Sequence, residues 1–206
     1  MPEQFDLFTP PQDEIQTPPK PSRGPRILVF DLETQKSVDD VGGWGNVHLM
    51  KMAVGVVWDS VDQKYYTYRE QDAEQLVDKL KTADLVVGFN VIGFDYSVLQ
   101  PYASFDLQEI PTFDLLLDVK KKLGFRLSLN HLAQQTLNVK KSADGLISLQ
   151  WFKEGKIDRI IEYCTKDVEI TRDLFLFGET HGYICYLTKS GVSQQLEVDW
   201  KIDKLV

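Results

Sequence analysis

The chain has 206 residues, of which 43% are hydrophobic, and its 23 basic and 31 acidic residues give a net charge of -8. This size and apolar content suit one domain with a substantial core and a tail, not two domains. The acidic balance excludes a broadly basic coat for nucleic acid. It leaves a nuclease open, because bound divalent cations reverse the local charge where a phosphate must sit.

The cysteine content and the hydropathy pattern indicate where the protein is expected to work. Cys164 and Cys185 are the two cysteines, and neither belongs to a C-x-x-C pair, so the sequence shows no metal-binding cysteine pair. No apolar run is long enough to cross a membrane, and there is no charged-then-apolar leader. We expect a soluble, cytoplasmic protein with no membrane partner.

Residues 1–25 differ in composition from the rest of the chain. They contain most of the prolines and few apolar residues after Phe8. Such a segment buries too little apolar surface to offset the entropy of ordering it. We therefore divide the chain into a disordered, proline-rich tail at 1–25 and one domain at 26–206.

The first half of the domain is rich in strands. Apolar runs predict strands at 26–32, 51–59, 64–68 and 84–89, and apolar residues at helical spacing predict a helix at 71–82. Three strands in succession indicate an antiparallel meander.

The second half is mainly helical. We expect a short helix at 97–102, an extended piece at 110–113, helices at 115–123, 128–137 and 157–180, and a β-hairpin around 189–191. Ser128 suits a helix N-cap, and Gly124 and Gly182 suit helix ends. This order of elements predicts an α/β fold in which helices flank a mixed sheet.

Carboxylates occur at three separated places in this pattern. Asp31 and Glu33 end the first strand, and because strand side chains alternate between faces, both point the same way. Asp95 follows a buried strand, and Asp167 lies four residues after Tyr163, a spacing that places both side chains on one helix face. Mg²⁺ and Mn²⁺ prefer such hard oxygen ligands, and two ions roughly 3.5–4 Å apart hydrolyse phosphodiesters.

The segments FDLET (30–34), NVIGFD (90–95) and YCTKD (163–167) resemble, in this order, the three motifs of the DEDD superfamily of 3′-to-5′ exonucleases, which has a ribonuclease H-like fold. The resemblance covers residues 26 to about 180. It implies that two divalent ions, Mg²⁺ or Mn²⁺, are bound by the catalytic carboxylates Asp31, Glu33, Asp95 and Asp167.

The same resemblance implies a subclass and further site residues. The histidine type of the superfamily would place a histidine at position 162, which is Glu162 here, whereas Tyr163 fits the tyrosine (DEDDy) type, in which it orients the attacking water. Thr34 and Asn90 would contact the terminal nucleotide or support the site, and Phe94 would pack near it. These three residues are the expected substrate-binding set.

Other charged residues have competing interpretations. Asp114 either supports the site from behind its carboxylates or caps the following helix, and Asp118 is expected on a solvated helix face. The basic clusters are 120–122 with Arg126, and 140–141. They either contact a phosphate backbone or are solvated charges.

The tail contains an apolar segment, QFDLF at 4–8, which resembles the peptide by which bacterial replication and repair proteins dock on the sliding clamp. In that interpretation Leu7 and Phe8 fill an apolar pocket and Gln4 makes orienting hydrogen bonds. The alternative is that the segment folds back onto the domain as a strand or staple.

Together the motifs predict a metal-dependent 3′-to-5′ exonuclease that removes nucleoside monophosphates from nucleic-acid 3′ ends. The expected substrate is single-stranded DNA or a DNA 3′ end, in replication or repair. One alternative is an RNA exonuclease with the same ions and fold. The other is a nucleic-acid-binding or clamp-tethered adaptor whose nuclease site is vestigial, and the complete set of carboxylates argues against it.

Overall fold

A five-stranded mixed sheet forms the centre of the protein. The computed structural model describes residues 24–139 and 146–206, so the tail with its clamp-like peptide, and the basic pair 140–141, lie outside the described residues. The strand order is β3-β2-β1-β4-β5, and the strands are β1 (Ile27–Thr34), β2 (Met52–Asp59), β3 (Lys64–Arg69), β4 (Leu85–Gly88) and β5 (Thr112–Asp114).

The pairing of these strands confirms the predicted meander and mixed sheet. Strands β1, β2 and β3 pair antiparallel, and β4 and β5 continue the sheet from β1 in parallel. The carboxyl ends of β1, β4 and β5 therefore lie at the same edge, where open α/β sheets commonly place their binding sites.

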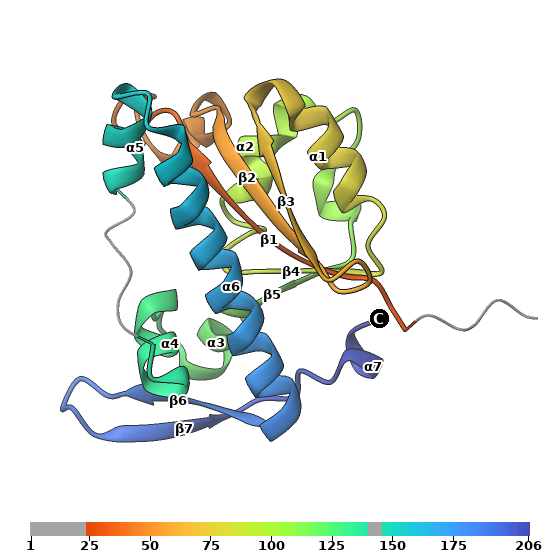
Figure 1. The fold of residues 1–206 in the computed structure, drawn as a ribbon. Coiled ribbons are helices and arrows are strands. Elements are labelled where there is room, and N and C mark those ends of the chain that lie inside the picture. Colours follow the sequence, from red (N-terminus) through yellow and green to blue (C-terminus); the bar gives the residue numbers. More distant parts are fainter. Residues whose placement is uncertain (1–23, 140–145) are drawn as a thin grey trace, which may run out of the picture.

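Helices cover both faces of this sheet (Figure 1). Helix α6 crosses one face, and α1 and α2 lie against the other. The helices are α1 (Ala73–Leu80), α2 (Asp95–Leu99), α3 (Leu115–Leu123), α4 (Leu129–Leu137), α5 (Leu146–Lys153), α6 (Ile157–His181) and α7 (Ile202–Leu205), with short 3-10 turns η1 (Trp44–Leu49), η2 (Glu70–Asp72), η3 (Gln100–Tyr102) and η4 (Leu107–Glu109). None of these helices is long and apolar enough to cross a membrane.

The alternation of side chains along β1 divides the core into two layers. Ile27 and Val29 pack into the apolar cluster that contains residues of α6, whereas Phe30 packs into the cluster beneath α1 and α2. Because residues two apart share a face, Asp31 and Glu33 continue the row that begins with Ile27 and Val29. The sequence thus directs both carboxylates toward α6.

The predicted helix ends are confirmed, and several elements were missed, among them η1, η4, α5 and α7. Ser128 Oγ accepts the N–H of His131 at the start of α4, and Gly124 and Gly182 end α3 and α6 in the left-handed conformation. The short helix α2 begins at Asp95 instead of at 97. Sequence periodicity did not reveal η1 or α5, because η1 is short and α5 (LISLQWFK) carries apolar residues around most of its circumference.

The predicted C-terminal hairpin is confirmed as β6 (Tyr183–Leu187) and β7 (Ser193–Glu197), which form a separate two-stranded sheet. It leads into Trp200, whose ring is 1% exposed and stacks on Phe175 of α6. The indole N–H donates to the Asp118 carboxylate at 2.8 Å, and Lys122 also pairs with that carboxylate. The expectation of a merely solvated Asp118 was therefore wrong.

Gly178 of α6 allows Trp200 to pack closely, because a Cβ there would lie 2.2 Å from the Cε3 atom of the indole ring. Alanine in a helix interior normally gains up to about 1 kcal/mol over glycine. We expect Gly178→Ala to lower the free energy of unfolding instead, since overpacking costs roughly 1–3 kcal/mol. Urea unfolding measures this change.

The matched control is Gly178→Ala in a Trp200→Leu background, where the smaller side chain leaves room for the methyl group. There the substitution should be neutral or stabilising. A stabilising effect of Gly178→Ala on the wild-type chain would contradict the packing described here.

Candidate metal centre

Three carboxylates from distant parts of the chain meet at the end of β1. One ligand atom each from Asp31, Glu33 and Asp167 can be chosen so that all lie within 4.8 Å of one another. Asp31 and Glu33 reach this point through the alternation of β1, and Asp167 reaches it from α6, which crosses the same face (Figure 1). Among the acidic, histidine and cysteine side chains of the described residues, these three are close enough together to hold a metal ion.

Asp95 lies beside this group at the start of α2. It is 4% exposed, and its Oδ1 accepts the backbone N–H of Leu32 at 3.1 Å. Strand β4 ends at Gly88, and its last pair with β1 joins Val29 to Val87. Asp95 thus satisfies a backbone donor of β1 beyond the end of its neighbouring strand, and this bond fixes the carboxylate next to Asp31.

The electrostatics of the cluster favour neutral carboxyl groups while no cation is bound. Burial raises the pKa of Glu33 to about 8, and the hydrogen bond from Ser148 opposes that shift. Burial also raises the pKa of Asp95 to about 8 against the Leu32 N–H. The pKa of Asp31 is raised by burial first and then by the charges of Asp95, Asp167 and Glu33. A divalent cation would compensate this crowded negative charge.

The donor chemistry of the cluster fits Mg²⁺ or Mn²⁺. Carboxylate oxygens are the hard ligands that these ions select, and no histidine joins the group. Cys164 is adjacent, but its buried thiol donates to the Asp31 backbone oxygen at 3.3 Å and to Oδ2 at 3.5 Å. Burial and the Asp31 charge raise the pKa of Cys164, so it acts as a neutral hydrogen-bond donor there.

Tyr163 lies one helical turn before Asp167 and forms a side-chain hydrogen bond with it. Burial, followed by the Asp167 and Glu33 charges, raises the pKa of the phenol, which therefore keeps its proton. The ring also packs edge-on against Trp151 of α5, with centroids 6.2 Å apart. Helix α5 thus contacts the tyrosine ring through Trp151.

Ser148 of α5 is a site residue that sequence reasoning missed. It is 1% exposed, and its Oγ donates to Glu33 Oε2 at 2.6 Å although the two residues are 115 positions apart. A serine in an unpredicted helix gives no sequence signal of this contact. The bond fixes one carboxylate oxygen of Glu33 at the cavity wall.

A cavity of about 490 Å³ opens over the carboxylates. Its walls come from β1, the β1–β2 loop, the β4–α2 turn, α5 and α6. It brings together every catalytic and substrate-binding residue that the sequence predicted within the domain, namely Asp31, Glu33, Thr34, Asn90, Phe94, Asp95, Tyr163 and Asp167.

Asp114 explains how the β4–α2 turn is held over the cavity. Its Oδ1 accepts the N–H of Asn90 at 2.9 Å and its Oδ2 accepts that of Ile92 at 3.1 Å. The same carboxylate caps α3 through Leu116 and Leu117. Both interpretations of Asp114 therefore describe contacts that it makes. The anchor also holds Asn90, whose φ of 69° is tolerated by asparagine.

Of the predicted basic residues, Arg126 lies next to the site. Its Nη2 donates to Asn90 Oδ1 at 3.3 Å, and it lines a second cavity of about 510 Å³ that shares Phe89, Asn90 and Asp167 with the first. Lys122, by contrast, pairs with Asp118 at 2.8 Å and lines neither cavity.

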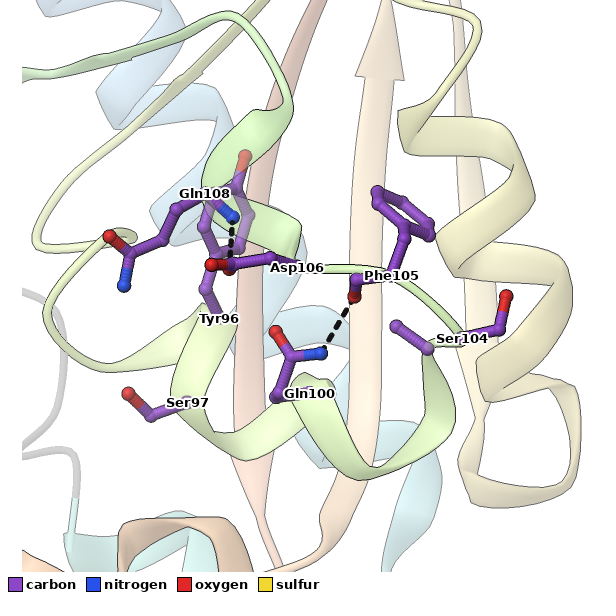
Figure 2. A pocket seen from close by; sticks show the side chains of 8 residues that line it. Tyr96, Ser97, Gln100, Ser104, Phe105, Asp106 and Gln108 are labelled. Atoms are coloured by element: carbon purple, nitrogen blue, oxygen red, sulfur yellow. Dashed lines mark hydrogen bonds between the residues drawn. The ribbon is translucent and has the colours of Figure 1, made fainter.

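A third cavity, of about 560 Å³, shares no lining residue with the carboxylate cavity (Figure 2). Two of its polar side chains bond within the loop: Gln100 donates to the Phe105 carbonyl at 2.7 Å, and Asp106 accepts the N–H of Gln108 at 2.9 Å. These contacts hold the turn after α2 in shape.

Comparisons with known proteins agree with this architecture. The family model described as the RNase_H superfamily matches residues 28–176. Among solved structures, the family B DNA polymerase from the hyperthermophilic archaeon Pyrobaculum calidifontis is similar, with a TM-score of 0.55 and 18% sequence identity. The match covers 75% of this chain and 25% of the polymerase, so it relates the fold to one part of that protein. No curated protein matches the sequence.

The raised pKa values predict how the chelated, metal-free protein responds to pH. Folded Glu33 and Asp95 hold their protons up to about pH 8, whereas in the unfolded chain they release them near their ordinary values of about 4. The stability that these protons contribute is therefore complete below about pH 4 and is lost as the pH rises through about 8. Thermal unfolding in EDTA between about pH 5 and about pH 9 should show the Tm falling.

Glu33→Gln is the matched control, because the amide oxygen still accepts the Ser148 hydroxyl and does not titrate. Its Tm should fall less over the same range, and excess Mn²⁺ should reverse the fall in the wild type. A wild-type Tm that parallels that of Glu33→Gln at every pH would show that Glu33 is not perturbed.

Proposed function

The chain belongs to the RNase_H superfamily, and from this premise we propose that it is a metal-dependent 3′-to-5′ exonuclease of the tyrosine (DEDDy) type. Its substrate in this proposal is the 3′ end of DNA, and residues 26–206 form the exonuclease domain. The observation that carries the proposal is the convergence of Asp31, Glu33 and Asp167 within 4.8 Å at the floor of an open cavity.

Asp31, Glu33, Asp95 and Asp167 would hold two Mg²⁺ or Mn²⁺ ions. When bound, the ions would supply an activated water at neutral pH and stabilise the charge that develops on the phosphate oxygens. The chain supplies the positioning of these ligands: the Leu32 N–H fixes Asp95, the Cys164 thiol fixes Asp31, and Ser148 fixes Glu33.

Tyr163 would orient the attacking water. Its hydroxyl forms a hydrogen bond with Asp167, and Tyr163 lines the cavity, where the phenol oxygen would also accept a hydrogen bond from the attacking water. Because its pKa is raised, the phenol stays neutral and adds no negative charge next to a phosphodiester. A tyrosine in this state positions the water and does not remove its proton.

The substrate strand would lie across two neighbouring cavities, which share Phe89, Asn90 and Asp167 as lining residues. Thr34, Asn90 and Phe94 line the carboxylate cavity and would bind the terminal nucleotide. Arg126 lines the neighbouring cavity, where a phosphate of the preceding nucleotides would find a cation.

The clamp-like peptide supports DNA as the substrate, because a sliding clamp would deliver the enzyme to DNA. In this proposal Gln4, Leu7 and Phe8, which lie outside the described residues, dock on the clamp of a bacterium. The alternatives are an RNA exonuclease with the same site and a nucleic-acid-binding adaptor with a vestigial site.

Digestion of 5′-labelled single-stranded DNA and RNA with Mn²⁺ tests the proposal. Wild type should produce a ladder that shortens from the 3′ end. Asp31→Ala should lower the rate on the order of 1000-fold, because it removes a ligand whose metals supply several kcal/mol of transition-state stabilisation. It should remain folded, since it relieves carboxylate repulsion.

Two further variants sharpen this comparison. Asp158→Ala removes an exposed carboxylate of α6 that lies outside the cluster and lines neither cavity, and should retain wild-type activity. Tyr163→Phe should lose less activity than Asp31→Ala, because the ligands remain. Faster digestion of RNA than DNA would favour the RNA exonuclease, and intact strands with wild type would leave the adaptor.

A further inference from the structure

A fourth cavity lies where α5 and α6 meet. It has a volume of about 350 Å³ and is lined by Trp151 of α5 and by Arg159, Glu162, Tyr163 and Lys166 of α6. We call it the Trp151 cavity. Tyr163 also lines the carboxylate cavity, and no other residue lines both. The two cavities are therefore neighbours on either side of this tyrosine.

The spacing of residues along α6 assembles the wall of the Trp151 cavity. Arg159, Tyr163 and Lys166 follow one another at intervals of four and three residues, which places their side chains on one helix face. The short connection between the helices holds Trp151 against the start of that face, because its carbonyl accepts the N–H of Lys156 at 2.8 Å. In the sequence the two cations are isolated charges, and only the folded helix brings them to one side of the indole.

Arg159 is a cation without an acidic partner. Its guanidinium lies over the Trp151 ring, 6.0 Å from the centroid, and it forms no ion pair with a carboxylate among residues 24–139 and 146–206. Lys166 pairs with Glu169 at 2.5 Å, which occupies one of its three N–H donors. With Glu162 as its acid, the wall carries two cations and one anion. The described residues that line the carboxylate cavity include no lysine or arginine.

These groups favour a ligand that combines an anion with an aromatic ring. An arginine stacked on an aromatic ring still presents a planar fork of N–H donors, which binds phosphate oxygens in pairs. Indole and phenol rings pack against a nucleobase whatever its identity. The volume lies within the range of small-ligand sites, roughly 300–1,000 Å³. A single nucleotide carries both a phosphate and a base, and therefore matches both parts of the wall.

We propose that the Trp151 cavity binds a nucleoside 5′-monophosphate, with its phosphate on Arg159 and Lys166 and its base against Trp151. The choice of ligand rests on the proposed exonuclease function, because a nucleoside monophosphate is the product of that reaction. The site needs no metal ion, since its own side chains supply the positive charge. Product bound there contacts Tyr163 from outside the carboxylate cavity, which gives the enzyme a means of responding to accumulated product.

NMR titration of the chelated protein with deoxyadenosine 5′-monophosphate tests this site. The indole N–H signals distinguish the cavities, because Trp151 lines one and Trp44, which is 73% exposed, lines the other. In EDTA the Trp151 signal should shift and saturate with a Kd on the order of 1 mM, since exposed ion pairs contribute little. The Trp44 signal should not shift, and Asp31→Ala should bind the nucleotide as the wild type does.

Variants and partial ligands identify the contacts. Arg159→Ala should weaken binding about 10-fold or more, the loss of one charge-assisted contact. Arg159→Lys should lose less, because it keeps the charge without the fork. Lys156→Ala is the matched control, since it removes the same charge from an exposed residue that does not line the cavity, and it should bind normally. Deoxyadenosine and inorganic phosphate should each bind more weakly than the nucleotide, because each lacks one of its two groups.

Three results would overturn the site: a shift of the Trp44 signal in place of the Trp151 signal, equal affinity for inorganic phosphate and the nucleotide, or equal losses in Arg159→Ala and Lys156→Ala. These results would leave the exonuclease proposal standing, because the titration contains neither metal nor strand. The digestion of labelled strands tests that proposal separately.

Discussion

The candidate site depends on the packing of α6 across β1. Val29 of the strand and Cys164 and Val168 of the helix belong to one buried apolar cluster, which fixes the distance between the two elements. The strand then presents Asp31 and Glu33 to that side, and Asp167 follows Cys164 on the helix. Apolar burial, which has no direction of its own, thereby places polar ligands with a defined geometry.

The packing places acidic side chains together, and the surrounding contacts restrain them. The backbone N–H of Leu32 and the hydroxyl of Ser148 each bind one carboxylate, although burial still raises the pKa of both acids. This is the condition in which a metal site gains most from its cation, since the ligands are already oriented and crowded. The buried acids do not themselves stabilise the fold. Apolar packing elsewhere does, for example the contact of Trp200 with Phe175 of α6.

Local sequence patterns predicted those features of the structure that depend only on neighbouring residues. The strand alternation of Asp31 and Glu33, the cap at Ser128 and the helix end at Gly124 each depend on a few adjacent residues. The contact of Ser148 with Glu33, the docking of Trp200 on Asp118 and the exposure of Trp44 connect or depend on distant segments. No periodicity records such contacts, so they became visible only when the chain was folded. Asp114 lies between these cases: the sequence left open whether it caps α3 or supports the site, and in the folded chain its carboxylate does both.

Calorimetric titration of the chelated protein with Mn²⁺ at about pH 7 tests the central claim most directly, because it measures the carboxylate cluster as a metal site without any substrate. The account predicts saturable binding to the wild type with release of protons, seen as a heat that varies with the ionisation enthalpy of the buffer, and loss of that binding in Asp31→Ala. No binding, or equal binding by wild type and Asp31→Ala, would contradict it.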